Sequence, residues 1–147
     1  MASSFITMDD THGFWIRDSL MQVVCWGLVI VIDEIPDDDF WAKGTFREHI
    51  FNNSQGIFVG FMHLLLDEYL ITQKRKIDFC QIILNTKRFF LNKGDFIAIK
   101  ELNDFQMIRD TKATWQSPLE TSRVIKILSF LQDVVNNEIG DEKEYEF

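Results

Sequence analysis

The stretch SLMQVVCWGLVIVIDEIPDDDFW, residues 19–41, joins a dense apolar run to a dense acidic one. The apolar run extends for 13 residues from Leu20 to Ile32 and includes Gln22 and Gly27. A transmembrane helix needs about 20 consecutive apolar residues. Basic anchors are expected at a cytoplasmic flank, yet both flanks of this run are acidic. The run is therefore too short for a membrane anchor, and we expect a buried core element.

The conformation of this core element is the first question. Residues 23–32 contain enough Val and Ile for a strand. The run is longer than most strands, however, and Asp18, Gln22 and Asp33 fall on one side of a helix. The pattern favours a central helix.

The acidic half of the stretch is the candidate functional site. A solvated turn that caps a helix is the plainest interpretation, and a protein-docking surface is the second. Catalytic carboxylates would need desolvation to raise the pKa of one of them. A calcium loop would need a glycine and a distal glutamate, which do not follow Asp39. The candidate partner-binding residues are Asp33, Glu34, Asp37, Asp38, Asp39 and the aromatic anchor Trp41.

The length of 147 residues fits a single helical domain covering residues 1–147. We expect residues 1–12 and 141–147 to be flexible at its ends. Cys25 and Cys80 lie in apolar runs and are predicted to be buried free thiols. With no signal peptide in the sequence, these thiols favour a cytoplasmic location.

The net charge of −8 is unevenly distributed along the chain. Residues 1–72 contain eleven acidic and three basic residues, whereas residues 73–112 contain five acidic and nine basic ones. Residues 113–147 are acidic again, with seven acidic and three basic residues. Binding to nucleic acid requires Lys and Arg to neutralise phosphates, so this balance predicts no nucleic-acid partner.

Helical periodicity is clearest between Asp78 and Asn92. Polar residues recur there at every third or fourth position, which predicts an amphipathic helix. The residues expected to face the core are Ile77, Cys80, Ile83, Leu84 and Leu91.

A second helix is predicted within residues 117–140. Ser117 and Glu120 form a capping box, Pro118 takes the first helical position, and Gly140 stands where the helix should stop. The residues expected on its buried side are Val124, Ile127, Leu128, Leu131 and Val135.

Three further segments complete the predicted fold. We expect a mostly buried helix from Gln55 to Thr72, and a helix within residues 39–52 capped by one of the three aspartates. Asp95 could cap a short helix that ends at Phe105, although residues 96–100 also alternate like a strand. The predicted fold class is all-α, an irregular single-domain bundle of five to six helices.

The other groups of polar residues give little indication of a metal site or a catalytic site. His63 and Asp67 have the spacing of half a metal site, but an isolated pair lacks the remaining ligands. Cys80 would need a nearby base to act as a nucleophile. The basic segment with Lys74, Arg75 and Lys76 is interpreted as a solvated loop and helix face. Without a phosphate-binding loop, a serine elbow or paired CxxC motifs, we expect no enzymatic activity, cofactor or metal.

The chain resembles the immunity proteins of bacterial contact-dependent growth inhibition and related polymorphic toxin systems. The resemblance lies in a short, acidic, Phe- and Trp-rich chain with a start like GFWIRDSLMQVVCWGLVIVIDEIP and a closing helix like SPLETSRVIKILSFLQDVVNN. It implies a cytoplasmic antidote that covers the active site of a cognate toxin C-terminal domain, a basic nuclease being the expected kind. The alternative is a helical adaptor or scaffold with another protein partner.

Overall fold

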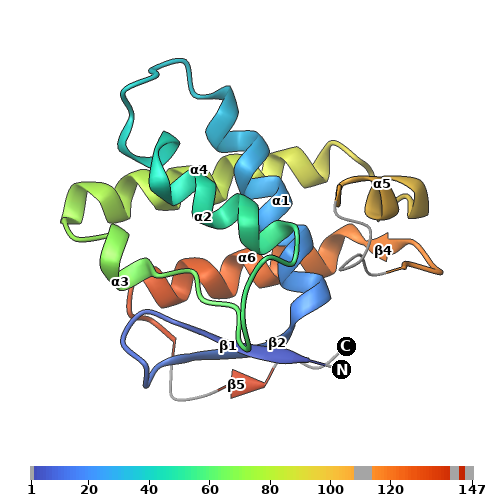
Figure 1. Ribbon diagram of the computed structural model, residues 1–147, viewed down its shortest axis with the longest axis horizontal. Helices are drawn as coiled ribbons and strands as arrows, with labels where there is room; N and C mark the ends of the chain where they lie inside the picture. The colour runs from blue at the N-terminus through green and yellow to red at the C-terminus, as the bar shows by residue number, and fades with distance from the viewer. Residues whose placement is uncertain (1, 108–113, 140–142, 145–147) are drawn as a thin grey trace.

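The computed structural model describes residues 2–107, 114–139 and 143–144. In this part of the chain, helices pack with two small β-sheets (Figure 1). The helices are α1 Asp18–Glu34, the 3-10 helix η1 Trp41–Lys43, α2 Thr45–Ser54, α3 Leu66–Tyr69, α4 Gln73–Leu91, α5 Ile99–Asp104 and α6 Thr121–Val135. The strands are β1 Ser3–Thr7, β2 Gly13–Arg17, β3 Phe96–Ile97, β4 Leu119–Glu120 and β5 Lys143–Glu144. With 56% helix and 11% strand, the fold is mostly helical, and the all-α expectation is correct only in part.

Helix α1 is the central element, which confirms the helical interpretation of the apolar run. Twelve of its 17 residues are buried. Helices α2, α4 and α6 all contact it, and Figure 1 shows α1 crossing α4 and α6 with α2 in front. A helix surrounded in this way needs apolar side chains on nearly every side, which explains why the run has so few polar positions.

Gly27 allows α1 and α4 to approach closely. A Cβ atom added at Gly27 would lie 2.6 Å from Cζ of Phe90 and 3.1 Å from Cγ2 of Thr86. Phe90 and Thr86 are both fully buried on α4. The missing side chain therefore makes room for the Phe90 ring at the crossing of the two helices.

The sheets lie at two edges of the helical core. Strands β1 and β2 form an antiparallel hairpin in which Ser3 pairs with Arg17 and Thr7 with Gly13, and β5 runs parallel to β2. Strands β3 and β4 form a short antiparallel pair. These strands have two to five residues each, so their sequences contain too few alternations to stand out from a helical background.

The N-terminal segment 1–12, which we expected to be flexible, contains strand β1. Ile6 is buried, and the hydroxyl of Ser4 donates a hydrogen bond to Asp18 Oδ1 at 2.6 Å. The same hydroxyl accepts a hydrogen bond from the backbone N–H of Met62 at 2.9 Å. These contacts fix the strand against α1. Of residues 141–147, only β5 belongs to the described part of the chain.

The predicted helix from Gln55 to Thr72 is wrong over most of its length, since only α3 is helical there. Gly56 and Gly60 have φ angles of 78° and 74°, and Leu65 has a left-handed φ of 54°. Positive φ angles interrupt a right-handed helix, so this segment turns repeatedly.

Two other predicted boundaries also differ. Helix α2 begins at Thr45 after Gly44, so none of the aspartates at 37–39 caps it. Residues 96–97 are a strand and α5 follows from Ile99, so both interpretations of this segment are correct in part. Ala98, not Asp95, precedes α5.

Helix α6 confirms the predicted buried side, but its start differs. Val124, Ile127, Leu128, Leu131 and Val135 are all buried. The helix begins at Thr121, because Leu119 and Glu120 pair with β3, and no side chain caps its N-terminus. The helix ends at Val135, before the predicted stop at Gly140, and Gly140 itself lies outside the described residues.

Helix α4 is confirmed as a helix, but its buried face differs from the predicted one. The residues that it buries are Phe79, Ile82, Ile83, Thr86 and Phe90. Of the five residues expected to face inward, only Ile83 is buried; Cys80 is half-buried, and Ile77, Leu84 and Leu91 are exposed. Helix α4 thus has a second apolar face in contact with solvent.

Candidate protein-binding surface

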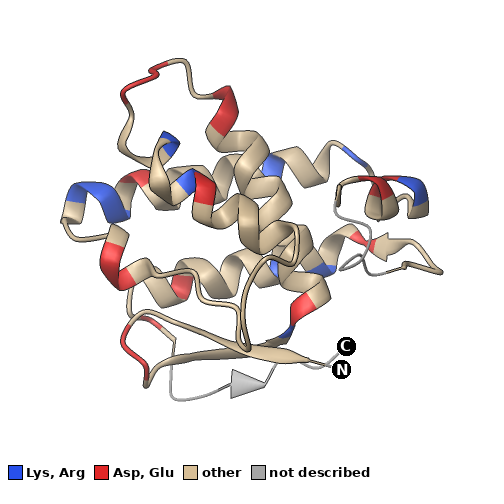
Figure 2. Cartoon of the chain, viewed as in Figure 1, with Lys and Arg blue, Asp and Glu red and all other residues tan. Residues whose placement is uncertain are grey.

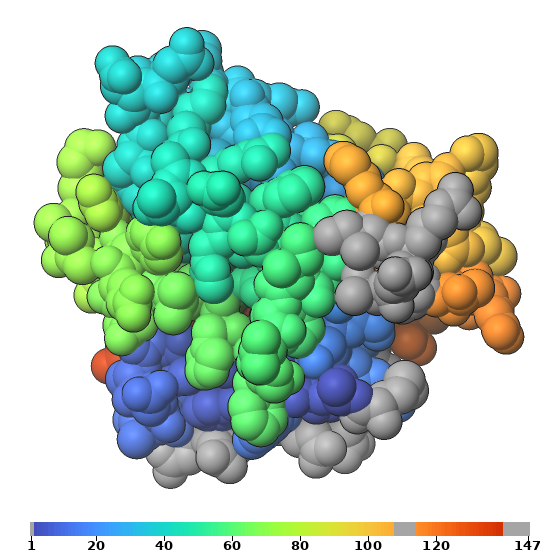
Figure 3. Space-filling model, viewed as in Figure 1, coloured from blue at the N-terminus to red at the C-terminus, as the bar shows by residue number. Residues whose placement is uncertain are grey.

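The acidic turn, defined here as residues 33–39, connects the end of α1 to η1. Red segments of the cartoon mark its acidic residues in the loop at the top of Figure 2, and the segment projects from the upper edge of the molecule in Figure 3. The five acidic residues that the sequence singled out are all exposed: Asp33, Glu34, Asp37, Asp38 and Asp39.

Two of the five carboxylates have basic partners. Arg47 on α2 donates two hydrogen bonds to Asp33, from Nε and from Nη2, each at 2.9 Å. Hydrogen bonding to Asp33 raises the pKa of Arg47 above its ordinary value. Lys43 Nζ lies 3.5 Å from Asp38 Oδ1. Within the described part of the chain, Glu34, Asp37 and Asp39 form no ion pair. The turn therefore presents three uncompensated negative charges to solvent.

Local hydrogen bonds hold the acidic turn in one conformation. Lys43 Nζ donates to the carbonyl of Ile35, which follows the last residue of α1. The backbone N–H of Phe40 donates to the carbonyl of Asp37 at 3.1 Å. The side chain of Asp37 accepts a hydrogen bond from the backbone N–H of Asp39 at 3.0 Å, a local bond typical of aspartate in turns. The carboxylates are thus displayed on an ordered turn.

Two of these acids lie at the electrostatically unfavourable end of a helix. Asp33 and Glu34 are the last residues of α1, whose last turn has no basic residue. The C-terminus of a helix has a partial negative charge, so each exposed carboxylate there costs about 0.3–1 kcal/mol. Arg47 offsets this for Asp33 only. The placement of Glu34 is therefore unfavourable for the stability of α1.

Trp41 lies beside the acidic turn, half-buried against α4. Its Nε1 donates a hydrogen bond to Asp78 Oδ2 at 3.0 Å, and the guanidinium of Arg75 lies 5.0 Å from the centre of its ring. The ring also packs against Phe40 and Phe46, with centroids 5.8 and 5.4 Å apart. These contacts hold Trp41 and η1 against α4, and the role of Trp41 as an aromatic anchor for a partner stays a prediction.

A groove of about 450 Å³ borders the acidic turn, between the end of α1 and α4. Glu34 and Pro36 line one side, and Arg88 and Asn92 line the other. The sequence did not indicate this groove, because α1 and α4 are far apart in the chain. Nor did it indicate Arg47, which lies 14 residues after Asp33 and reaches it only because α2 packs on α1.

His63 and Asp67 do not share a helix, so the half-site spacing read from the sequence does not apply. His63 precedes α3, and its carbonyl accepts hydrogen bonds from Asn53 Nδ2 at 2.8 Å and from His49 Nε2. Among the described residues, no group of three or more His, Cys, Asp or Glu side chains could hold a metal ion.

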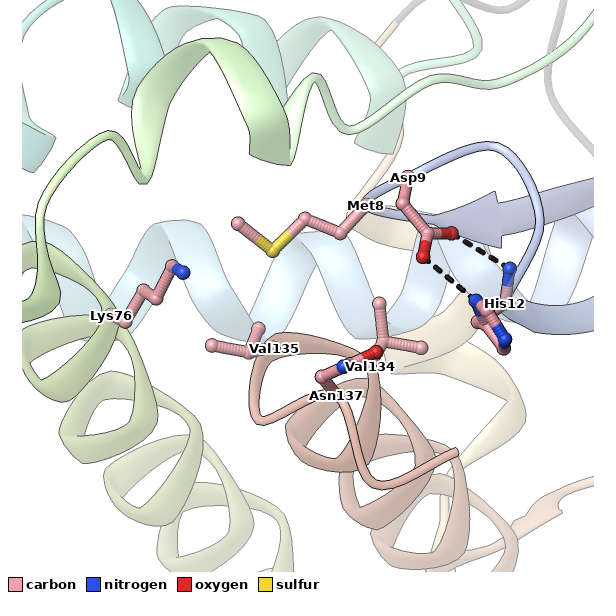
Figure 4. A pocket seen from close by; sticks show the side chains of 7 residues that line it. All are labelled: Met8, Asp9, His12, Lys76, Val134, Val135 and Asn137. Atoms are coloured by element: carbon pink, nitrogen blue, oxygen red, sulfur yellow. Dashed lines mark hydrogen bonds and ion pairs between the residues drawn. The ribbon is translucent and has the colours of Figure 1, made fainter. Parts of the chain in front are cut away.

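A different acid–histidine pair borders a cavity of about 330 Å³ (Figure 4). Asp9 Oδ2 lies 2.8 Å from His12 Nδ1, and Asp9 Oδ1 accepts a hydrogen bond from the backbone N–H of His12 at 2.7 Å. These bonds, with a further one from Thr11 N–H, hold the pKa of Asp9 well below its ordinary value. Lys76 and Val135 line the other side of the cavity. The pair stabilises the turn between β1 and β2. Sequence spacing alone did not reveal it.

The two cysteines are free thiols with different surroundings. Cys25 is buried in α1 and Cys80 is half-buried on α4. Burial raises the pKa of both thiols, and the charge of Glu138 raises that of Cys80 further. Both thiols are therefore protonated near neutral pH.

The helices were also compared with the length and apolarity that a membrane span requires. Among the described residues, none of the helices meets both requirements.

Comparisons with known proteins yield no relative. No family model matches the chain, and neither a curated protein nor a solved structure matches it. The functional argument therefore depends on the geometry and charge of this molecule.

Proposed function

We propose that this chain is an immunity protein that binds the C-terminal domain of a cognate bacterial toxin and covers its active site in the cytoplasm. The observation that carries the proposal is the group of three unpaired, exposed carboxylates, Glu34, Asp37 and Asp39, on a turn held by internal bonds. The partner that fits this surface is a basic protein domain. A nuclease is the expected kind, because its own surface must attract phosphates.

Electrostatic attraction is the expected first step of binding. A surface of one sign steers a partner of the opposite sign and raises association rates toward about 10⁸–10⁹ M⁻¹s⁻¹ at low salt. An ordered turn adds to this, because little conformational entropy remains to be lost on binding. An interface of standard size would bury about 1,600 Å² in total.

The cost of placing Glu34 at the end of α1 supports the same proposal. The carboxylate of Glu34 lowers the stability of α1 and does not stabilise the fold, whereas it adds to the negative potential of the turn. The expected role of the residue is therefore on the partner-facing side of the molecule.

The alternative is a helical adaptor or scaffold protein that joins two protein partners. One observation favours it, namely the second apolar face of α4, which is exposed and lies outside the acidic turn. An adaptor needs two binding surfaces, whereas an antidote needs one.

Co-expression and binding kinetics test the proposal. A toxin domain encoded beside this chain should be lethal alone and harmless when the chain is co-expressed. Asp37→Lys with Asp39→Lys should slow association with that domain and weaken the dependence of the rate on salt, because both unpaired charges are reversed. Association rates would be measured by stopped-flow fluorescence over a salt series.

The matched control reverses two exposed acids elsewhere, with Asp67→Lys and Glu68→Lys on α3. This variant has the same net charge as the first and should associate faster than it. Equal rates for the two variants would remove the acidic turn from the interface. Turnover of a substrate by the purified chain without any partner would contradict the antidote function.

A further inference from the structure

Within the described part of the chain, helix α4 has an apolar stripe that no other element covers, formed by Ile77, Leu84 and Leu91. Their exposed fractions are 61%, 42% and 59%. The opposite face of α4 supplies Phe79, Phe90 and other buried residues to the core. The stripe is therefore additional to the apolar surface that the fold itself requires.

The spacing of the α4 stripe matches a helical partner. Its three residues are seven positions apart and so occupy one position of a heptad repeat, with Cys80 and Lys87 at the intermediate positions. They drift by only about 20° per heptad on a straight helix, so they stay nearly in line. From Ile77 to Leu91 the stripe extends for about 21 Å at 1.5 Å per residue, a length of about four turns.

A groove beside the stripe offers room for partner side chains. It has a volume of about 330 Å³ and lies between α4 and α6. Ile77, Cys80 and Leu84 line one side, and Gln132 and Asn136 line the other. Apolar side chains of a partner helix can insert beside Leu84, while the amides of α6 can donate hydrogen bonds to carboxylates at the edge.

The charge of α4 specifies the chemistry of the partner. The helix contains five basic residues and a single acidic one, Asp78, for a net charge of +4 in a chain of net charge −8. Asp78 is engaged with Trp41 at 3.0 Å and Lys74 at 3.1 Å. Lys87 and Arg88 lie between Leu84 and Leu91 along the stripe, and Arg88 is exposed. The C-terminal half of the apolar stripe is thus flanked by two cations, Lys87 and Arg88.

We propose that the α4 stripe docks an acidic amphipathic helix of another protein, with its apolar residues on Ile77, Leu84 and Leu91 and its carboxylates toward Lys87 and Arg88. In such a helix-in-groove contact, apolar side chains at helical spacing on the partner helix insert into the groove. A second copy of this chain fits less well, because pairing two α4 stripes would bring together two surfaces that each carry Lys87 and Arg88 and no carboxylate of α4. This inference does not depend on the immunity function.

The test uses the full chain and two synthetic peptides. Both peptides have leucine at heptad positions a and d; one has glutamate and the other lysine at the flanking e and g positions. Like charges at e and g also discourage each peptide from pairing with itself. Fluorescence anisotropy should show saturable binding of the glutamate peptide and binding of the lysine peptide that is weaker by about tenfold or more.

Two variants locate the binding surface. Leu84→Glu at the centre of the stripe should weaken binding of the glutamate peptide by about tenfold or more, because it removes an apolar anchor and adds a like charge. Val59→Glu is the matched control: Val59 is fully exposed in a loop outside α4, and the substitution makes the same change of charge. It should leave binding unchanged, and circular dichroism should show native helix content in both variants.

Four results would overturn the proposal. They are the absence of saturable binding of the glutamate peptide, equal affinity for the lysine peptide, equal loss of binding in the Val59→Glu variant, and a dimer of the chain in analytical ultracentrifugation that Leu84→Glu dissociates. The last result would assign the stripe to a second copy of the chain. Because Leu84→Glu and Val59→Glu leave the acidic turn unchanged, failure here would leave the toxin-binding proposal standing.

Discussion

Gly27 illustrates how a single residue sets the packing of the core. The Phe90 ring occupies the space that a side chain at position 27 would fill. Gly27→Ala should therefore destabilise the protein by about 1–3 kcal/mol, the usual cost of overpacking a core, although alanine is the better helix former. Urea unfolding followed by circular dichroism would measure the change.

The control for this prediction is a double-mutant cycle with Phe90→Leu. Leucine removes the ring atoms that the new methyl group would meet, so Gly27→Ala should cost less in that background. Additive costs of the two substitutions would show that the Phe90 ring is not what excludes a side chain at position 27.

Long apolar or amphipathic helices are easier to predict from this sequence than its short strands. Helix α1 was predicted from the length of its apolar run and from its few polar positions, and the buried side of α6 was predicted from its helical periodicity. Strands β1 and β2 were missed because each has only five residues, and β5 was missed because it has two residues and pairs with the distant β2. Intrinsic propensity is a weak guide in such cases.

Helix α4 shows a different kind of error. It was predicted as a helix, but two apolar patterns overlap in its sequence, and periodicity alone does not say which one the core selects. The bulky rings of Phe79 and Phe90 are buried, and Ile77, Leu84 and Leu91 remain exposed. The exposure of the acidic turn followed from its composition, whereas its pairing with Arg47 required the packing of α2 on α1.

The end of α1 offers a test of whether function opposes stability in this molecule. Glu34→Gln removes a negative charge from the C-terminus of the helix and should raise the free energy of unfolding by about 0.3–1 kcal/mol. Glu48→Gln is the matched control, because Glu48 lies in the first turn of α2, where a carboxylate is favourable. It should lower stability slightly. Chemical unfolding of both variants would reveal the opposite signs, and a loss of stability in Glu34→Gln would contradict the unfavourable placement.

The charged residues divide the surface of the protein into two regions with different expected partners. The acidic turn carries three unpaired carboxylates at one edge, and α4 carries a net charge of +4 (Figure 2). The two regions meet at the groove that Glu34 and Arg88 both line. A basic partner and an acidic one would therefore approach neighbouring surfaces of the same molecule.

The excess of acidic residues should also set how stability responds to salt. With 23 acidic and 15 basic residues, mutual repulsion opposes the compact state. Exposed ion pairs such as Lys100–Asp104 are already weakened by the surrounding water, so their loss on screening should not dominate. Raising NaCl from about 0.01 M to 0.15 M shortens the Debye length from about 30 to 8 Å and should shift the urea midpoint upward.

Replacing Asp37 and Asp39 by Asn should reduce that shift, because it removes two of the unpaired charges. A midpoint that falls with salt would instead show that ion pairs, not the surplus of carboxylates, govern the electrostatic part of folding.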